Sequence, residues 1–203
     1  MKYLFITVLT AACLFCTPAF AAAGETVSST ETAEISATSE TTEPAETAEA
    51  PERNTATEVM EIHDGEFDIE QLIRIAIDNQ KNSYAPYSEY NVSAAMLMDS
   101  GIVYKGVNVE NASYPAGICA ERNAIFDAIE CGERKIVAIA IVGGPNFTIK
   151  DYCAPCGICR QVMREFCDPK EMRVIFAKTE TDYKNMSLEE LLPESFGPEA
   201  LEV

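Results

Sequence analysis

Most of what this sequence predicts depends on two short runs, Cys119-Ala120-Glu121-Arg122 and Pro155-Cys156-Gly157-Ile158-Cys159-Arg160. In proteins zinc is bound mainly by Cys and His, and a catalytic zinc site keeps three protein ligands and one open position for water. The chain contains a single His, so a His-rich site is excluded. The spacing of Cys156 and Cys159 lets both sulfurs reach one ion from the start of a helix, and Cys119 would come from a second helix start. The sequence therefore predicts one zinc ion held by three thiolates.

Glu121 is the expected proton-transfer group of this site. It lies two residues after Cys119, too close to be a comfortable fourth ligand but well placed to contact a water on the metal. Three thiolates and Zn²⁺ leave one net negative charge, which opposes ionisation of that water. Positive charge is therefore expected nearby, and two helix N-termini together with Arg122 could supply it.

The first 21 residues have the pattern of an export signal. Lys2 forms a short basic region, the stretch 3–16 is almost wholly apolar, and Ala19-Phe20-Ala21 is a small-x-small cleavage site. The apolar stretch is too short for a comfortable membrane span. We therefore expect a signal peptide over 1–21, an exported (periplasmic or secreted) protein, and no stable membrane insertion after cleavage. An uncleaved anchor is the alternative.

Residues 22–58 are built mainly from Thr, Ala, Ser and Glu and contain no aromatic residue. Such a segment cannot bury enough apolar surface to offset the loss of chain entropy on folding. It is expected to be a disordered linker or a substrate for O-glycosylation, and the composition does not decide between these. The remaining residues, 59–203, have the length of one ordinary domain.

The charge of this domain argues against a nucleic-acid partner. Residues 1–58 hold two basic and nine acidic residues, which leaves 13 basic and 24 acidic residues for 59–203, a formal charge of −11. Nucleic-acid binders need a basic surface that displaces counterions. A small-molecule substrate is therefore expected.

Apolar periodicity and turn residues predict a mixed sheet with helices on both faces. Helices are expected at 67–81, 119–131, 156–167 and 187–192, the last beginning with a capping box of Ser187 and Glu190. Strands are expected at 90–98, 102–109, 136–142 and 172–177, with the apolar 136–142 at the centre. Both ligand segments then lie at strand-to-helix junctions at one end of the sheet, where ligands bind in such folds.

Three further cysteines follow the signal segment: Cys131, Cys153 and Cys167. Cys131 and Cys167 are expected to be small buried apolar residues. Cys153 extends the ligand pair to C-x₂-C-x₂-C, which could also begin an iron–sulfur site. The usual fourth Cys of such a site is missing, so zinc is the preferred interpretation.

The pattern Cys-x-Glu followed by Pro-Cys-x-x-Cys is that of zinc-dependent deaminases. Residues from about Phe67 to Leu201 resemble the small homotetrameric cytidine deaminases of pyrimidine salvage. The resemblance rests on five runs taken in order: Tyr84-Ala85-Pro86-Tyr87-Ser88, Asn108-Val109-Glu110-Asn111-Ala112, Gly117-Ile118-Cys119-Ala120-Glu121-Arg122, Pro155-Cys156-Gly157-Ile158-Cys159-Arg160-Gln161-Val162, and Glu190-Leu191-Leu192-Pro193 with Phe196-Gly197-Pro198.

The resemblance implies a three-layer α/β/α sandwich with a mixed five-stranded sheet, and a homotetramer. It implies hydrolytic deamination of cytidine and deoxycytidine, with Cys119, Cys156 and Cys159 as zinc ligands. Glu121 would move protons from water to ring nitrogen N3 and then to the leaving ammonia.

Further residues acquire roles from the same resemblance. Arg122 matches a residue that hydrogen-bonds the thiolates, and Asn108 and Glu110 match a pair that holds the ribose hydroxyls. Tyr90 matches an aromatic residue that packs on the substrate, and Phe196 would reach a neighbouring subunit's site. Tyr114 could stack on the substrate or simply pack.

The sequence departs from the family pattern at several points. Ser93 stands where Gly is usual, Tyr90 adds a hydroxyl group, and the loop 143–152 is longer than usual. An export signal is unusual for a salvage enzyme. Two alternatives therefore stay open: a deaminase of another amino-pyrimidine nucleoside, such as a blasticidin-type antibiotic, and a non-catalytic zinc-stabilised exported module.

Overall fold

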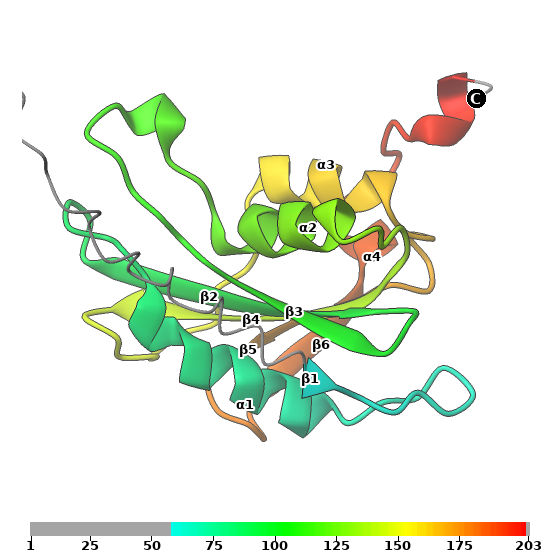
Figure 1. Cartoon of the computed structure of the whole chain (residues 1–203), viewed down its shortest axis with the longest axis horizontal. Helices are drawn as coiled ribbons and strands as arrows, with labels where there is room; N and C mark the ends of the chain where they lie inside the picture. Colours follow the sequence, from blue (N-terminus) through cyan, green and yellow to red (C-terminus); the bar gives the residue numbers. More distant parts are fainter. Residues whose placement is uncertain (1–57, 202–203) are drawn as a thin grey trace, which may run out of the picture. The chain divides into compact units, whose positions relative to one another are not determined.

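A six-stranded mixed sheet forms the centre of the computed structural model, which describes residues 58–201 (Figure 1). The strands lie in the order β1-β3-β2-β4-β5-β6. Their bounds are β1 Glu58–Val59, β2 Tyr90–Met98, β3 Ile102–Val107, β4 Ile136–Pro145, β5 Arg173–Ala177 and β6 Tyr183–Ser187. Strands β4 and β5 pair in parallel, and the other neighbours pair antiparallel.

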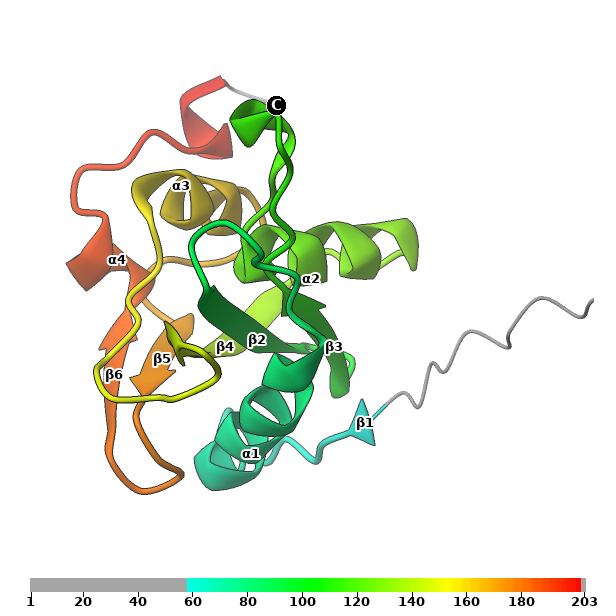
Figure 2. The ribbon, with the colours of Figure 1, turned by 90° about the vertical axis from the view of Figure 1, so that its left-hand side faces the viewer.

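Helices cover both faces of this sheet (Figure 2). The α-helices are α1 Ile69–Asn79, α2 Ala120–Glu130, α3 Gly157–Glu165 and α4 Leu188–Leu191, and short 3₁₀ helices are η1 Gln80–Asn82, η2 Tyr114–Ala116 and η3 Pro198–Leu201. One core contains buried residues of α2, α3 and α4, and the other contains those of α1. The predicted three-layer α/β/α sandwich is thus confirmed.

Alternation along β2 shows how one strand serves both cores. Ala94, Met96 and Met98 belong to the core with α2 and α3, whereas Ala95 and Leu97 belong to the core with α1. Strand β4 is divided in the same way. A strand covered on both faces carries a continuous apolar run because neither set of side chains meets water. This is why the run 136–142 could be placed at the centre of the sheet.

The sheet has six strands, one more than the resemblance implies and two more than the apolar pattern predicts. Strand β1 adds only two residues at the β3 edge, held by the pairs Glu58↔Val103 and Val59↔Ile102. Strand β6, whose sequence is Tyr-Lys-Asn-Met-Ser, escaped the sequence analysis because an edge strand with polar residues lacks a clear apolar pattern. The helix at 187–192 is present as α4, with the predicted capping box of Ser187 and Glu190.

The predicted signal peptide (1–21) lies outside the described residues, as does the linker (22–58) apart from Glu58. Among the helices of 58–201, none combines the length and apolar character needed to cross a membrane.

The ligand helices begin where the sequence analysis placed them. Cys119 is the N-cap of α2 and Cys156 is the N-cap of α3. Helix α2 lies against β3 at Gly106, where an added Cβ would be 2.2 Å from the carbonyl oxygen of Ala120 and 2.5 Å from the backbone nitrogen of Ala124. Glycine at this position therefore lets the first turn of α2 approach the sheet.

Replacing Gly106 with alanine is expected to destabilise the protein. The atoms that a Cβ would meet belong to the backbone and cannot rotate away, so the helix must shift, at a cost of about 1–3 kcal/mol in the free energy of unfolding. Thermal unfolding followed by circular dichroism measures this loss. Gly157→Ala is the matched control, because nothing lies within 4 Å of its added Cβ and α3 begins there. Equal melting temperatures for Gly106→Ala and wild type would contradict the close approach.

Candidate zinc centre and active site

Three cysteine sulfurs meet where α2 and α3 begin. The Sγ atoms of Cys119, Cys156 and Cys159 all lie within 4.8 Å of one another, and those of Cys156 and Cys159 are 3.4 Å apart. Tetrahedral zinc with Zn–S bonds of about 2.3 Å places its sulfurs about 3.8 Å apart. The donor set and its spacing therefore fit a zinc ion. Three thiolates this close would repel one another strongly unless a cation lay between them.

The surroundings favour the ionised form of Cys119. Its pKa is lowered to about 5, first by a hydrogen bond from Cys159 and also by Arg122, whose Nη2 donates to the Cys119 sulfur over 3.6 Å. The pKa of Cys159 is raised, first because this thiol donates its proton to Cys119. A bound cation would take the place of that shared proton.

Arg122 lies where the sequence analysis expected positive charge. Its side chain is in contact with Cys119, and its Nε is buried without a hydrogen-bond partner in the part of the chain that the structure describes. The N-termini of α2 and α3 add partial positive charge at the same place because both helices begin at ligand cysteines.

Glu121 is a buried carboxylic acid in the first turn of α2. It is only 4% exposed and it lines the cavity beside Cys119. Its pKa is raised, chiefly by burial and further by the charge of Cys119. A carboxyl group in this position can hold and release a proton inside the cavity.

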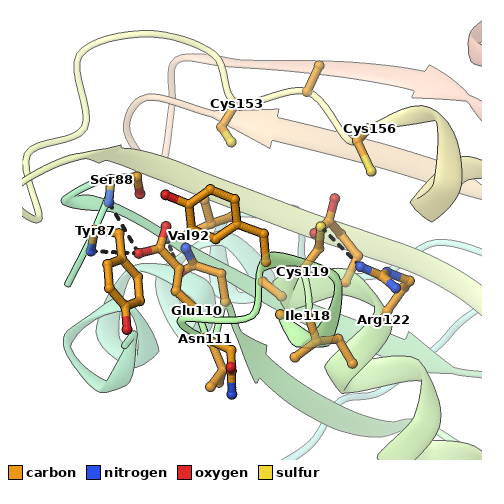
Figure 3. A pocket seen from close by; sticks show the side chains of 17 residues that line it. Tyr87, Ser88, Val92, Glu110, Asn111, Ile118, Cys119, Arg122, Cys153 and Cys156 are labelled. Carbon is orange, nitrogen blue, oxygen red and sulfur yellow. Dashed lines mark hydrogen bonds between the residues drawn. The ribbon is translucent and has the colours of Figure 1, made fainter. Parts of the chain in front are cut away.

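The cavity has a volume of about 670 Å³ (Figure 3). It extends from the sulfur cluster and Glu121 to a polar region at the ends of β2 and β3. Seven of the predicted site residues line it: Cys119, Cys156, Glu121, Arg122, Asn108, Glu110 and Tyr114. Cys159 is fully buried and does not line the cavity.

Glu110 is fixed at the polar end of the cavity. One oxygen of its carboxylate, Oε2, accepts hydrogen bonds from the backbone nitrogens of Tyr87 at 2.9 Å and Ser88 at 3.2 Å. The side chain of Ser88, followed by these amides, lowers the pKa of Glu110, so the carboxylate stays ionised at neutral pH. Tyr87 and Ser88 belong to one of the runs that carry the family resemblance, but their contact with Glu110 could not be predicted from the sequence.

Two predicted substrate contacts do not line the cavity of a single chain. Tyr90 is 38% exposed at the start of β2, and Phe196 is 61% exposed near the C-terminus. The segment carrying Phe196 is bound to α3, because Gln161 donates to the carbonyl of Phe196 at 3.0 Å and Arg164 pairs with Glu199. The roles of Tyr90 and Phe196 stay predictions. Tyr114 lies edge-on to Tyr87, with ring centres 6.3 Å apart.

The remaining cysteines differ from expectation in part. Cys153 lines the cavity. Among the described residues, however, only Cys119, Cys156 and Cys159 bring their side-chain ligand atoms close enough together to hold a metal ion, so an iron–sulfur site that includes Cys153 is not supported. Burial raises the pKa of the Cys153 thiol to about 11. Cys167 is half-buried, whereas Cys131 is exposed, contrary to prediction, because α2 ends at Glu130 and leaves the next residue at its C-cap.

Comparison with known proteins agrees with this geometry. Residues 67–177 match the family model described as "Cytidine and deoxycytidylate deaminase zinc-binding region", and this stretch contains all three cysteines and Glu121. A cytidine deaminase of Halalkalibacterium halodurans is 42% identical over 132 residues, which are 65% of this chain and 96% of that protein.

The chain belongs to the cytidine deaminase family.

Other family members match over a similar stretch. A cytidine deaminase of Sporosarcina psychrophila is 37% identical over 134 residues, covering 66% of this chain and 95% of that protein. The crystal structure of cytidine deaminase from Burkholderia pseudomallei is 41% identical, with a TM-score of 0.57, over 62% of this chain and 97% of that one. The cytidine deaminase fold and its zinc-binding region thus lie within the described part of the chain.

Single substitutions of the cysteines should distinguish the zinc ligands from the neighbouring Cys153 by their effect on zinc content. Cys119→Ser and Cys159→Ser are expected to reduce zinc to well below one ion per chain, because two sulfurs do not form a stable zinc site. Cys153→Ser is the matched control and should retain one zinc. Plasma mass spectrometry of the purified proteins measures this content. Loss of zinc in Cys153→Ser, with full occupancy in Cys119→Ser, would contradict the ligand assignment.

Proposed function

We propose that this chain catalyses the hydrolytic deamination of cytidine and deoxycytidine to uridine and deoxyuridine. The observation that carries the proposal is the position of a buried carboxyl group, Glu121, beside the three sulfurs of a zinc site in a cavity with a polar opposite end. Pyrimidine salvage is the role that such an activity would serve.

The chemistry requires a nucleophile, a proton carrier and a binding site. Cys119, Cys156 and Cys159 would hold the zinc, which would supply an activated water for attack at neutral pH. Glu121 accepts a proton as the new C4–O bond forms and delivers it to ring nitrogen N3. Glu121 then carries the second proton of the water to the amino group, so that the C4–N bond breaks and ammonia leaves. One water is consumed for each ammonia released.

The rest of the cavity orients the nucleoside. Arg122 donates to Cys119 and, with the two helix N-termini, offsets the negative charge of the sulfurs. Asn108 and Glu110, at the other end of the cavity, hold the sugar. A volume of about 670 Å³ is within the usual range of small-molecule sites, and the formal charge of −11 over residues 59–203 does not favour a polynucleotide.

The proposal extends to a homotetramer. Large apolar side chains are exposed on several elements of the described chain, and Phe196 extends from a segment fixed to α3 without lining the cavity of its own chain. In a tetramer such a side chain would complete a neighbour's site. Light scattering from the purified protein is expected to give four chains per particle, and a monomer with full activity would contradict the shared site.

Glu121→Gln is the sharpest test of the proposed reaction. The amide keeps the size of the side chain but cannot carry the proton, so turnover should fall by at least about a thousandfold while one zinc per chain is retained. The fall in ultraviolet absorbance as cytidine becomes uridine measures turnover. Glu130→Gln, an exposed substitution at the other end of α2, is the control and should leave both quantities unchanged. Full activity in Glu121→Gln would remove this residue from the mechanism.

A further inference from the structure

A chain of hydrogen bonds connects Phe147, which follows β4, through Asn91 and Ser83 to Asn108. We propose that Ser83 and Asn91 are positioning residues, which orient the Asn108 amide so that it donates a hydrogen bond to a sugar hydroxyl of the substrate. The inference rests on the proposed function, because it names how the same site selects a nucleoside.

The orientation of Asn91 is fixed by the backbone. Asn91 is only 4% exposed, and its Oδ1 accepts a hydrogen bond from the backbone nitrogen of Phe147 at 3.2 Å. A backbone N–H can only donate, so this end of the amide must be the oxygen. The opposite end, Nδ2, therefore donates to the hydroxyl oxygen of Ser83 at 3.0 Å.

The Ser83 hydroxyl group accepts a hydrogen bond from Asn91 and donates one to Asn108. Because its oxygen accepts from Asn91, its proton is free to be donated, and it lies 2.6 Å from Oδ1 of Asn108. The backbone nitrogen of Val92 donates to the same Oδ1 at 2.8 Å. The Nδ2 of Asn108 donates to the carbonyl oxygen of Tyr90 at 2.8 Å. The two backbone partners set which end of the Asn108 amide is oxygen, and the Ser83 hydroxyl adds a third hydrogen bond that holds the amide in this orientation.

The consequence for the ligand is that Asn108 offers a donor and no acceptor. Its Oδ1 already accepts two hydrogen bonds, whereas one of the two N–H groups on Nδ2 has no partner among the described residues. Glu110 lines the same cavity two residues along an extended segment, and this residue offers an ionised carboxylate (Figure 3). A donor beside an acceptor suits a hydroxyl group, which accepts from one and donates to the other.

A purely structural role for the same hydrogen bonds makes a different prediction. If Ser83 only ties η1 to β2 and β3, its removal lowers stability and harms every substrate equally. If it orients Asn108, its removal harms only a substrate that carries the sugar hydroxyls. A pair of substrates that differ in these hydroxyls therefore separates the two roles.

The experiment compares kcat/KM for cytidine and for 2′,3′-dideoxycytidine in the zinc-loaded full-length protein. The wild type should prefer cytidine. Ser83→Ala should reduce this preference about five- to tenfold, roughly the effect of losing one well-aligned hydrogen bond, through a higher KM for cytidine with little change in kcat. Ser83→Thr keeps the hydroxyl and should restore the preference.

Two further variants make the test independent of folding losses. Asn91→Asp preserves shape but cannot donate, so the proton of Ser83 should turn towards the new carboxylate and the preference should fall as in Ser83→Ala. Ser93→Ala removes another buried hydroxyl, which bonds to Gly106 on β3 and not to Asn108, and it should keep the wild-type preference.

The outcomes are distinguishable. Equal losses for both substrates in Ser83→Ala, or a wild type that does not distinguish them, would overturn the positioning role. A wild-type protein that deaminates neither substrate would instead overturn the proposed function.

Discussion

The repulsion between three closely spaced sulfurs is the constraint on which the rest of this structure depends. Thiolates within 4.8 Å of one another require a cation between them, and the fold holds them there by starting two helices at the same place. Cys119 and Cys156 are N-caps, and Cys159 is on the first turn of α3. Their positions are therefore fixed by the packing of α2 and α3 on the sheet and not by loops that could rearrange.

The packing of α2 and α3 on the sheet also determines the burial of Glu121 and the place of the cavity. Gly106 lets the first turn of α2 approach β3 closely. The crossover from β4 to its parallel neighbour β5 begins with the loop that ends at Cys156 and continues through α3. Glu121 is buried because it occupies the first turn of α2. The cavity then opens towards the ends of β2 and β3, where Glu110 is held by the amides of Tyr87 and Ser88.

The sequence was sufficient for the parts of the site that depend on short spacing. The spacing of Cys156 and Cys159 places both on one helical turn, and Glu121 follows Cys119 by only two residues. In both cases the spacing in the sequence determines the geometry. The central strand followed from its continuous apolar run. The helix from Ser187 followed from its capping box.

Other features depend on contacts that spacing does not encode. The bond between Ser83 and Asn108 joins residues 25 apart, and that between Asn91 and Phe147 joins residues 56 apart, so neither could be inferred from local pattern. Strand β6 is polar and lies at an edge. Cys131 is exposed because α2 ends one residue earlier than its apolar pattern suggested. Export of the protein is still a prediction from residues 1–21.

The most direct test of the central claim is X-ray absorption at the zinc edge of the purified protein. Three sulfurs at about 2.3 Å and one oxygen at about 2.0 Å are predicted, because a catalytic site keeps one position for water. Four sulfur ligands, with Cys153 completing a closed structural site, would contradict it, as would a protein that binds no zinc.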